Sequence, residues 1–163
     1  MKQLPKVYIM SPPWTEHSGG CTVLHKLCHL LNEKGVKTYL HPMFNGQPFI
    51  TRNDWKVEFS TNADKQNDII IYPEGISGNP LGFKKVVRLV LNNPKPEERG
   101  YLPSDKLVYH HDFFYRYDFN MNTKKIVHLR DGSPQYKLHV IESRVDEFKD
   151  LGKYRMGTCY TMR

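Results

Sequence analysis

Cysteine is scarce in this chain, and its placement argues against the usual cysteine-based sites. Cys21, Cys28 and Cys159 are an odd number of residues with no CxxC spacing. A disulfide framework or a structural zinc site needs more cysteines at closer spacing. Cys21 and Cys28 fall within one expected helix, and we interpret them as small buried hydrophobic residues.

Long hydrophobic runs are also missing. No apolar stretch approaches the ~18 residues that a membrane-spanning helix needs, and no signal-peptide core follows the polar residues 1–6. We therefore expect a soluble cytoplasmic protein. With 163 residues, of which 39% are hydrophobic and 25% charged, the chain is long enough for one domain with its own core.

Acidic residues are outnumbered by basic ones, and 24 Lys and Arg against 17 Asp and Glu give a net charge of +7. Such a surplus favours anionic partners, including phosphates, nucleotides, nucleic acids and membrane surfaces. The basic residues are scattered, however, and only Lys84-Lys85 and Lys124-Lys125 are adjacent. A basic surface without a dedicated partner is the simpler interpretation, and nucleic-acid binding is the weakest of the functional alternatives.

The signature sequences of common active sites are absent. The chain has no GxGxxG, no Walker A loop, no Gx[ST]xG and no HExxH. His25 and His29 lie one helical turn apart but have no obvious third zinc ligand. His110 and His111 are adjacent on an expected strand, so their side chains point to opposite faces. We therefore expect no metal and no cofactor.

The chain does contain an alternation of β-rich runs and helical patterns. The predicted strands span residues 6–10, 36–40, 68–72 and 106–110, with shorter candidates at 55–59, 126–129 and 138–141. Helical spacing of apolar residues predicts helices over 21–34 and 80–93, and a short helical segment over 145–151. The alternation predicts an α/β fold: a Rossmann-like, open, mostly parallel sheet with helices on both faces.

The second predicted helix carries a clear start signal. Asn79 is expected to be its N-cap, with Pro80 at the first helical position. On this interpretation Lys84, Lys85 and Arg88 face away from the buried stripe.

Candidate functional residues follow the ends of the predicted strands, where open α/β sheets bind ligands. Gly19 and Gly20 lie between a strand and a helix N-terminus, whose N–H groups bind anions; the alternative is a plain tight turn. Glu74 and Ser77 follow the strand at 68–72, and Asn79 lies just beyond them. The alternative here is a solvated Glu74 and an Asn79 that only caps a helix.

Two long stretches resemble a known family. KVYIMSPPWTEHSGGCTVLHKLCHLLNEKGVKTYL resembles the N-terminal domain of GT-B glycosyltransferases, with its strand, Gly-Gly loop, long helix and second strand. DIIIYPEGISGNPLGFKKVVRLVLNNP is similar to the next section of that domain in family 4-type transferases of bacteria and viruses. The final GTCYTMR resembles the first strand of a second Rossmann-like domain. The resemblance implies an N-terminal domain over residues 1–150 and, over 151–163, a linker and the start of a C-terminal domain.

The resemblance implies an activity and roles for the candidate residues. Such enzymes transfer a sugar from a nucleotide-sugar donor to an acceptor hydroxyl, and their C-terminal domain holds most of the donor and, in retaining members, a Glu-x7-Glu pattern. That pattern does not occur in this chain. The implied roles are donor binding for Gly19 and Gly20, acceptor binding for Glu74, Ser77 and Asn79, and acceptor orientation for His110 or His111.

The resemblance also implies the partners. These are a nucleotide sugar, a carbohydrate or lipid-linked acceptor, and a C-terminal domain or partner subunit. Lipid-linked acceptors would place the protein peripherally at a membrane. A non-catalytic carbohydrate- or nucleotide-binding module that needs a partner subunit is the alternative.

Overall fold

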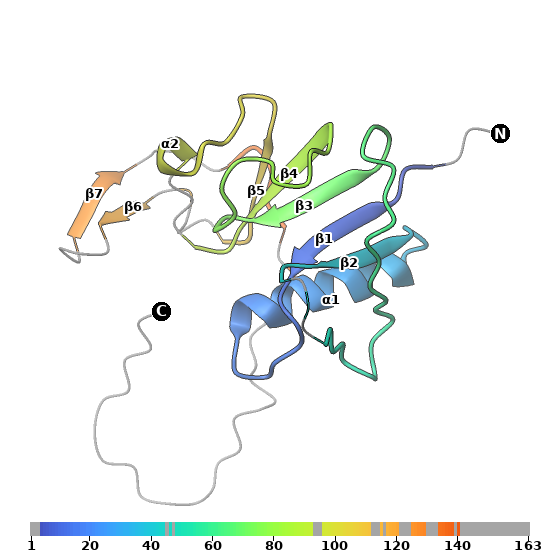
Figure 1. The fold of residues 1–163 in the computed structure, drawn as a ribbon. Coiled ribbons are helices and arrows are strands. Elements are labelled where there is room, and N and C mark those ends of the chain that lie inside the picture. Colours follow the sequence, from blue (N-terminus) through green and yellow to red (C-terminus); the bar gives the residue numbers. More distant parts are fainter. Residues whose placement is uncertain are drawn as a thin grey trace, which may run out of the picture.

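The fold is built on an all-parallel, five-stranded sheet with the order β2-β1-β3-β4-β5. The strands are β1 (Val7–Ser11), β2 (Thr38–Pro42), β3 (Ile69–Pro73), β4 (Lys85–Val90) and β5 (Lys106–Tyr109), shown in Figure 1. The computed structural model describes residues 4–44, 46, 48–92, 96–111, 115, 117–120, 125–129, 134–138 and 140. The open α/β sheet predicted from the sequence is confirmed.

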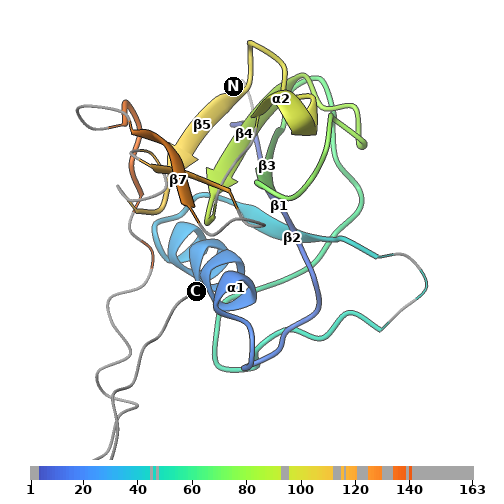
Figure 2. The same cartoon turned by 90° about the vertical axis from the view of Figure 1, so that its left-hand side faces the viewer.

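Helix α1 (Gly19–Glu33) joins β1 to β2 and lies along one face of the sheet (Figures 1 and 2). It begins two residues earlier than the apolar spacing predicts, because Ser18 caps it: the Ser18 Oγ accepts the amide of Cys21 at 3.2 Å. It ends at Glu33 with Lys34 as the C-cap, and Gly35 follows with a φ of 78°.

The core has one part on each face of the sheet. On the α1 face, apolar side chains of the strands pack against the buried stripe of α1; this part comprises Val7, Ile9, Val23, Leu24, Leu27, Cys28, Leu40, Leu89 and Val140. On the opposite face, Tyr8, Met10, Ile70, Tyr72, Phe83 and Val86 form a second cluster. Both faces of the central strands are therefore buried, which explains their almost continuous apolar sequences.

The predicted helix over residues 80–93 is wrong, because residues 85–90 form the parallel strand β4. Valines at 86, 87 and 90 suit a strand buried on both faces as well as they suit a helical stripe. Gly82, with a φ of 69°, interrupts any helix that starts at Asn79. Arg88 does not face solvent, as the helical pattern predicted, but is fully buried on the face opposite α1.

The connection from β3 to β4 is consequently short. Residues 74–84 cross over without a helix, whereas parallel strands are usually linked by a helix of about a dozen residues or more. The backbone polar groups of this loop need other partners. Several carbonyl groups of the loop accept hydrogen bonds from side chains of β4 and of the segment before β5. These bonds hold the loop in place.

The remaining elements are short. Helix α2 (Pro96–Arg99) precedes β5, and β6 (Tyr117–Asn120) pairs with β7 (Lys125–Leu129) in an antiparallel ladder that includes the predicted strand at 126–129. The candidates at 55–59 and 138–141 are not strands among the described residues; Phe59 and Lys137 form isolated bridges to Leu40 and Tyr109. The predicted segment 145–151 and the proposed linker 151–163 lie outside the described residues.

Candidate functional site

By the general rule for open α/β sheets, the strand order β2-β1-β3-β4-β5 predicts a ligand-binding edge between β1 and β3. From β1 the chain passes through α1 to β2 on one side, and β3 then pairs with β1 on the other side. At such a reversal the connections leave in opposite directions, and open α/β sheets generally bind ligands there. The segments that leave these ends carry Gly19 and Gly20 after β1 and Glu74 after β3.

Gly20 lies in the first turn of α1, beside the end of β4. A Cβ added to Gly20 would lie 3.9 Å from the Leu91 Cδ1 and 4.0 Å from the Ser18 Oγ, which is ordinary contact. Gly20 is helical and has no positive φ. Neither space nor backbone conformation therefore requires glycine at this position, so its presence is consistent with close approach of a ligand.

Glu74 directly follows β3, and its half-buried carboxylate turns toward the end of β4. Its Oε2 accepts the amide of Leu91 at 3.0 Å. Burial raises the pKa of Glu74, while the Leu91 amide and the positive charge of Arg99 act in the opposite direction. The Leu91 Cδ1 lies 3.9 Å from the place of a Cβ on Gly20, and the Leu91 amide binds Glu74, so Leu91 lies close to both predicted site segments.

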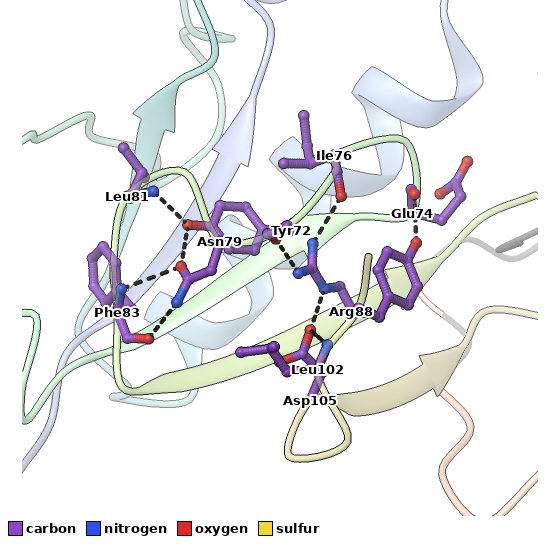
Figure 3. A network of polar contacts seen from close by, with 11 residues as sticks. Tyr72, Glu74, Ile76, Asn79, Leu81, Phe83, Arg88, Leu102 and Asp105 are labelled. Atoms are coloured by element: carbon purple, nitrogen blue, oxygen red, sulfur yellow. Dashed lines mark hydrogen bonds and ion pairs between the residues drawn. The ribbon is translucent and has the colours of Figure 1, made fainter. Parts of the chain in front are cut away.

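The loop after Glu74 is held by side chains of later segments (Figure 3). The hydroxyl of Tyr101 donates to the carbonyl oxygen of Glu74 at 2.5 Å, and Arg99 donates to that of Gly75 at 2.7 Å. The amide of Gly78 donates to the Arg99 carbonyl at 2.8 Å. These contacts fix the backbone that carries Glu74.

Arg88 on β4 is the centre of this network. Its Nε donates to the Asp105 Oδ2 at 2.9 Å, and both side chains are buried, with exposures of 0% and 1%. The guanidinium also donates to the carbonyl of Ile76 at 2.9 Å and to that of Gly78. It lies 4.9 Å from the ring centre of Tyr72 and 4.4 Å from that of Tyr101.

Sequence reasoning missed Arg88 as part of the site. The available signal was a single arginine inside a run of β-branched and aliphatic residues, VVRLV. Within a buried strand a lone arginine needs a carboxylate and further acceptors. The helical interpretation instead assigned the residue to solvent, so no partner was sought.

Ser77 and Asn79 occupy different parts of the β3–β4 loop. Ser77 is exposed. The Asn79 Oδ1 accepts the Tyr72 hydroxyl at 3.0 Å and the Phe83 amide at 3.2 Å, and its Nδ2 donates to the Phe83 carbonyl at 2.7 Å. Asn79 therefore closes the loop rather than capping a helix, and its amide is occupied by these contacts.

The histidines predicted as candidates lie at the end of β5, where the amide of His110 donates to the carbonyl of Val90 at 3.0 Å. His110 follows β5, which β3 and β4 separate from β1. Its Nδ1 lies 3.1 Å from the carbonyl oxygen of Leu138 and 3.5 Å from the amide nitrogen of Val140. His111 is exposed. The structure thus places Leu91 close to both Gly20 and Glu74, whereas His110 and His111 follow β5, which is not adjacent to β1 or β3.

The loop between β1 and α1 is anchored by α1 itself. The fully buried His25 places its Nε2 3.0 Å from the Pro12 carbonyl, and the Cys21 thiol donates to the Pro13 carbonyl at 3.4 Å. The amide of Trp14 donates to the Ile50 carbonyl at 2.8 Å. His25 therefore acts as an internal hydrogen-bond donor of the loop that leads to Gly19.

No metal centre is formed by the described residues, where no three His, Cys, Asp or Glu side chains are grouped to hold an ion. His29 uses its Nδ1 to accept the amide of Lys56 at 3.0 Å and does not share a partner with His25. In the part of the chain that the structure describes, no helix has the length and apolar character needed to span a membrane. Comparison with protein-family models, curated proteins and solved structures found no match.

Proposed function

We propose that this chain is the acceptor-side domain of a glycosyltransferase, which moves a sugar from a nucleotide donor to an acceptor hydroxyl. The observation that carries the proposal is the position of Leu91, whose amide binds Glu74 and whose side chain lies close to the first turn of α1. An anion-binding helix terminus and a carboxylate that both lie near Leu91 suit a reaction between a diphosphate and a hydroxyl.

The first turn of α1 would bind negative charge. During sugar transfer the glycosidic bond to the diphosphate breaks and the leaving phosphate gains charge. Free N–H groups and the positive end of a helix dipole stabilise such charge without a metal ion. α1 has no acidic side chain of its own in its first turn. Gly20 would let the phosphate approach the backbone.

Glu74 would act on the acceptor. A carboxylate accepts a hydrogen bond from a sugar hydroxyl and, when its pKa is raised by burial, removes that proton more effectively near neutral pH. Ser77, exposed on the same loop, would add a second hydroxyl contact. Asn79 would contribute through the shape of the loop, since its own amide is used internally.

Calorimetric titration of the chain with a panel of nucleotide sugars and oligosaccharides tests the proposal. We expect binding of at least one ligand that weakens in Glu74→Gln and in Gly20→Val. The control is Glu33→Gln, which removes a carboxylate at the far end of α1. Each variant is first compared with the wild type by circular dichroism.

The alternatives give different results in the same experiments. Binding without release of nucleoside diphosphate in the presence of acceptor would favour a non-catalytic binding module. Strongly salt-dependent binding to generic DNA or RNA, without binding of nucleotide sugars, would favour a nucleic-acid-binding protein.

A further inference from the structure

A buried ion pair is poor evidence of stability on its own. Removing two charges from water costs free energy that their attraction only partly returns, so apolar replacements are often as stable. The Arg88–Asp105 pair is nevertheless fully buried, and the guanidinium makes more contacts than charge neutralisation requires. Its additional partners are all in, or bonded to, the loop that carries Glu74.

We propose that Arg88 is a positioning residue that fixes the β3–β4 loop and thereby holds the carboxylate of Glu74 at the ligand-binding edge. The inference deepens the proposed function and rests on it for the identity of the ligand. The positioning itself is a property of the free chain and can be measured without any ligand.

Two routes connect Arg88 to Glu74. In the first, Arg88 binds the carbonyls of Ile76 and Gly78, so the loop cannot move away from β4. In the second, the guanidinium packs on the ring of Tyr101, and the Tyr101 hydroxyl donates to the backbone carbonyl of Glu74. Asp105 orients the guanidinium through its Nε.

A lysine cannot reproduce these contacts. Arginine presents a planar fork of donors and a flat face for aromatic rings, whereas lysine offers one compact ammonium group. Arg88→Lys therefore keeps a positive charge near Asp105 but cannot bind that carboxylate and two carbonyls with the same geometry. The substitution therefore tests the hydrogen-bond geometry of Arg88 separately from its positive charge.

Two measurements report directly on the position of the Glu74 carboxylate: carboxyl carbon-13 NMR of Glu74 and hydrogen exchange of the Leu91 amide. The Glu74 carboxylate accepts a hydrogen bond from the Leu91 amide, and it interacts electrostatically with Arg99 and Tyr101. If Arg88→Lys loosens the loop, the carboxylate becomes hydrated and the pKa of Glu74 falls toward its ordinary value of about 4.3. We also expect the Leu91 amide to exchange about tenfold faster, because its acceptor is no longer held.

A second variant covers the case in which Arg88→Lys does not fold. Tyr101→Phe keeps the ring beside Arg88 and removes only the hydroxyl that binds the Glu74 carbonyl. It should shift both readouts in the same direction by a smaller amount. Lys85→Met is the control, since Lys85 lies at the other end of β4 and donates to the carbonyl of Asn67.

The outcomes separate this inference from the proposed function. Unchanged titration of Glu74 and unchanged exchange of Leu91 in a folded Arg88→Lys protein would overturn the positioning role. If that variant is unfolded, the same null result in Tyr101→Phe would overturn it. Failure of the wild-type chain to bind any nucleotide sugar would instead count against the proposed function and leave the positioning measurement valid.

Discussion

Asp105→Asn should be one of the most destabilising single-atom changes in the molecule. The substitution keeps the shape of the side chain and removes its charge, while Arg88 remains fully buried. Leaving one partner of a buried ion pair uncompensated costs about 3–5 kcal/mol. A domain of this size has a total stability of about 5–15 kcal/mol, so the loss is a large fraction of it.

The exposed pair Arg52–Asp54 supplies a matched comparison. Its contact is shorter, at 2.6 Å against 2.9 Å, but the two side chains are 39% and 62% exposed. Water and salt screen such a pair, and its removal is commonly without measurable effect. We therefore expect Asp54→Asn to leave the midpoint of urea unfolding unchanged, although the ion pair that it removes has the shorter contact distance of the two.

Urea unfolding followed by tryptophan fluorescence and by circular dichroism gives both free energies. Trp14 and Trp55 report on the α1 side of the molecule, and the guanidinium of Arg52 lies 5.4 Å and 4.5 Å from their ring centres. Circular dichroism is therefore the readout that does not depend on the position of Arg52. Equal destabilisation by Asp105→Asn and Asp54→Asn would refute the reasoning, because burial would then have no influence on the value of the pair. A changed slope of the transition would indicate altered cooperativity instead.

Three further predictions concern other buried polar groups. Burial lowers the pKa of His25, so this side chain binds a proton less readily in the folded state than in the unfolded state. The free energy of unfolding should therefore be highest above pH ~6.5 and decrease as the pH falls below that value. In His25→Gln the decrease should be less steep. Burial raises the pKa of Cys28 to about 12, so in a Cys159→Ser background a thiol reagent at mildly alkaline pH should label Cys28 only after unfolding. Asn79→Ala should lower the free energy of unfolding in urea by about 1–3 kcal/mol, because the Tyr72 hydroxyl and the Phe83 backbone lose their partner; unchanged stability would contradict the loop-closing role.

The sequence was sufficient for β1, β2, β3, β5 and α1 because those elements carry redundant local signals. The isoleucines of β3 form a short apolar run bounded by polar residues, and the stripe of α1 repeats at helical spacing between Ser18 and Gly35.

The second half of the site could not be predicted in the same way. The run from Phe83 to Leu91 satisfies the apolar spacing of a helix and also the composition of a buried strand, and spacing alone does not distinguish them. The deciding contact joins Arg88 to Asp105, which is distant in sequence, and no local pattern reports it. The error at β4 therefore also concealed the network around Glu74.

Gly20 and Glu74 illustrate what strand ends do and do not reveal. Their position after β1 and β3 was sufficient to place both at the carboxyl edge, and the structure adds Leu91 as the residue that lies close to both. The same rule also selected His110, which the strand order moves away from the β1/β3 crevice. The rule identifies an edge, whereas the strand order decides which residues of that edge meet.

Amide NMR of the labelled chain during titration with nucleotide sugars tests the central claim most directly. The account predicts the largest shifts at Gly19, Gly20, Glu74 and Leu91, with little change at the amino ends of the strands, such as Ile69 and Lys85. Shifts confined to other surfaces, or no saturable shift with any nucleotide sugar, would contradict a ligand site at the β1/β3 edge.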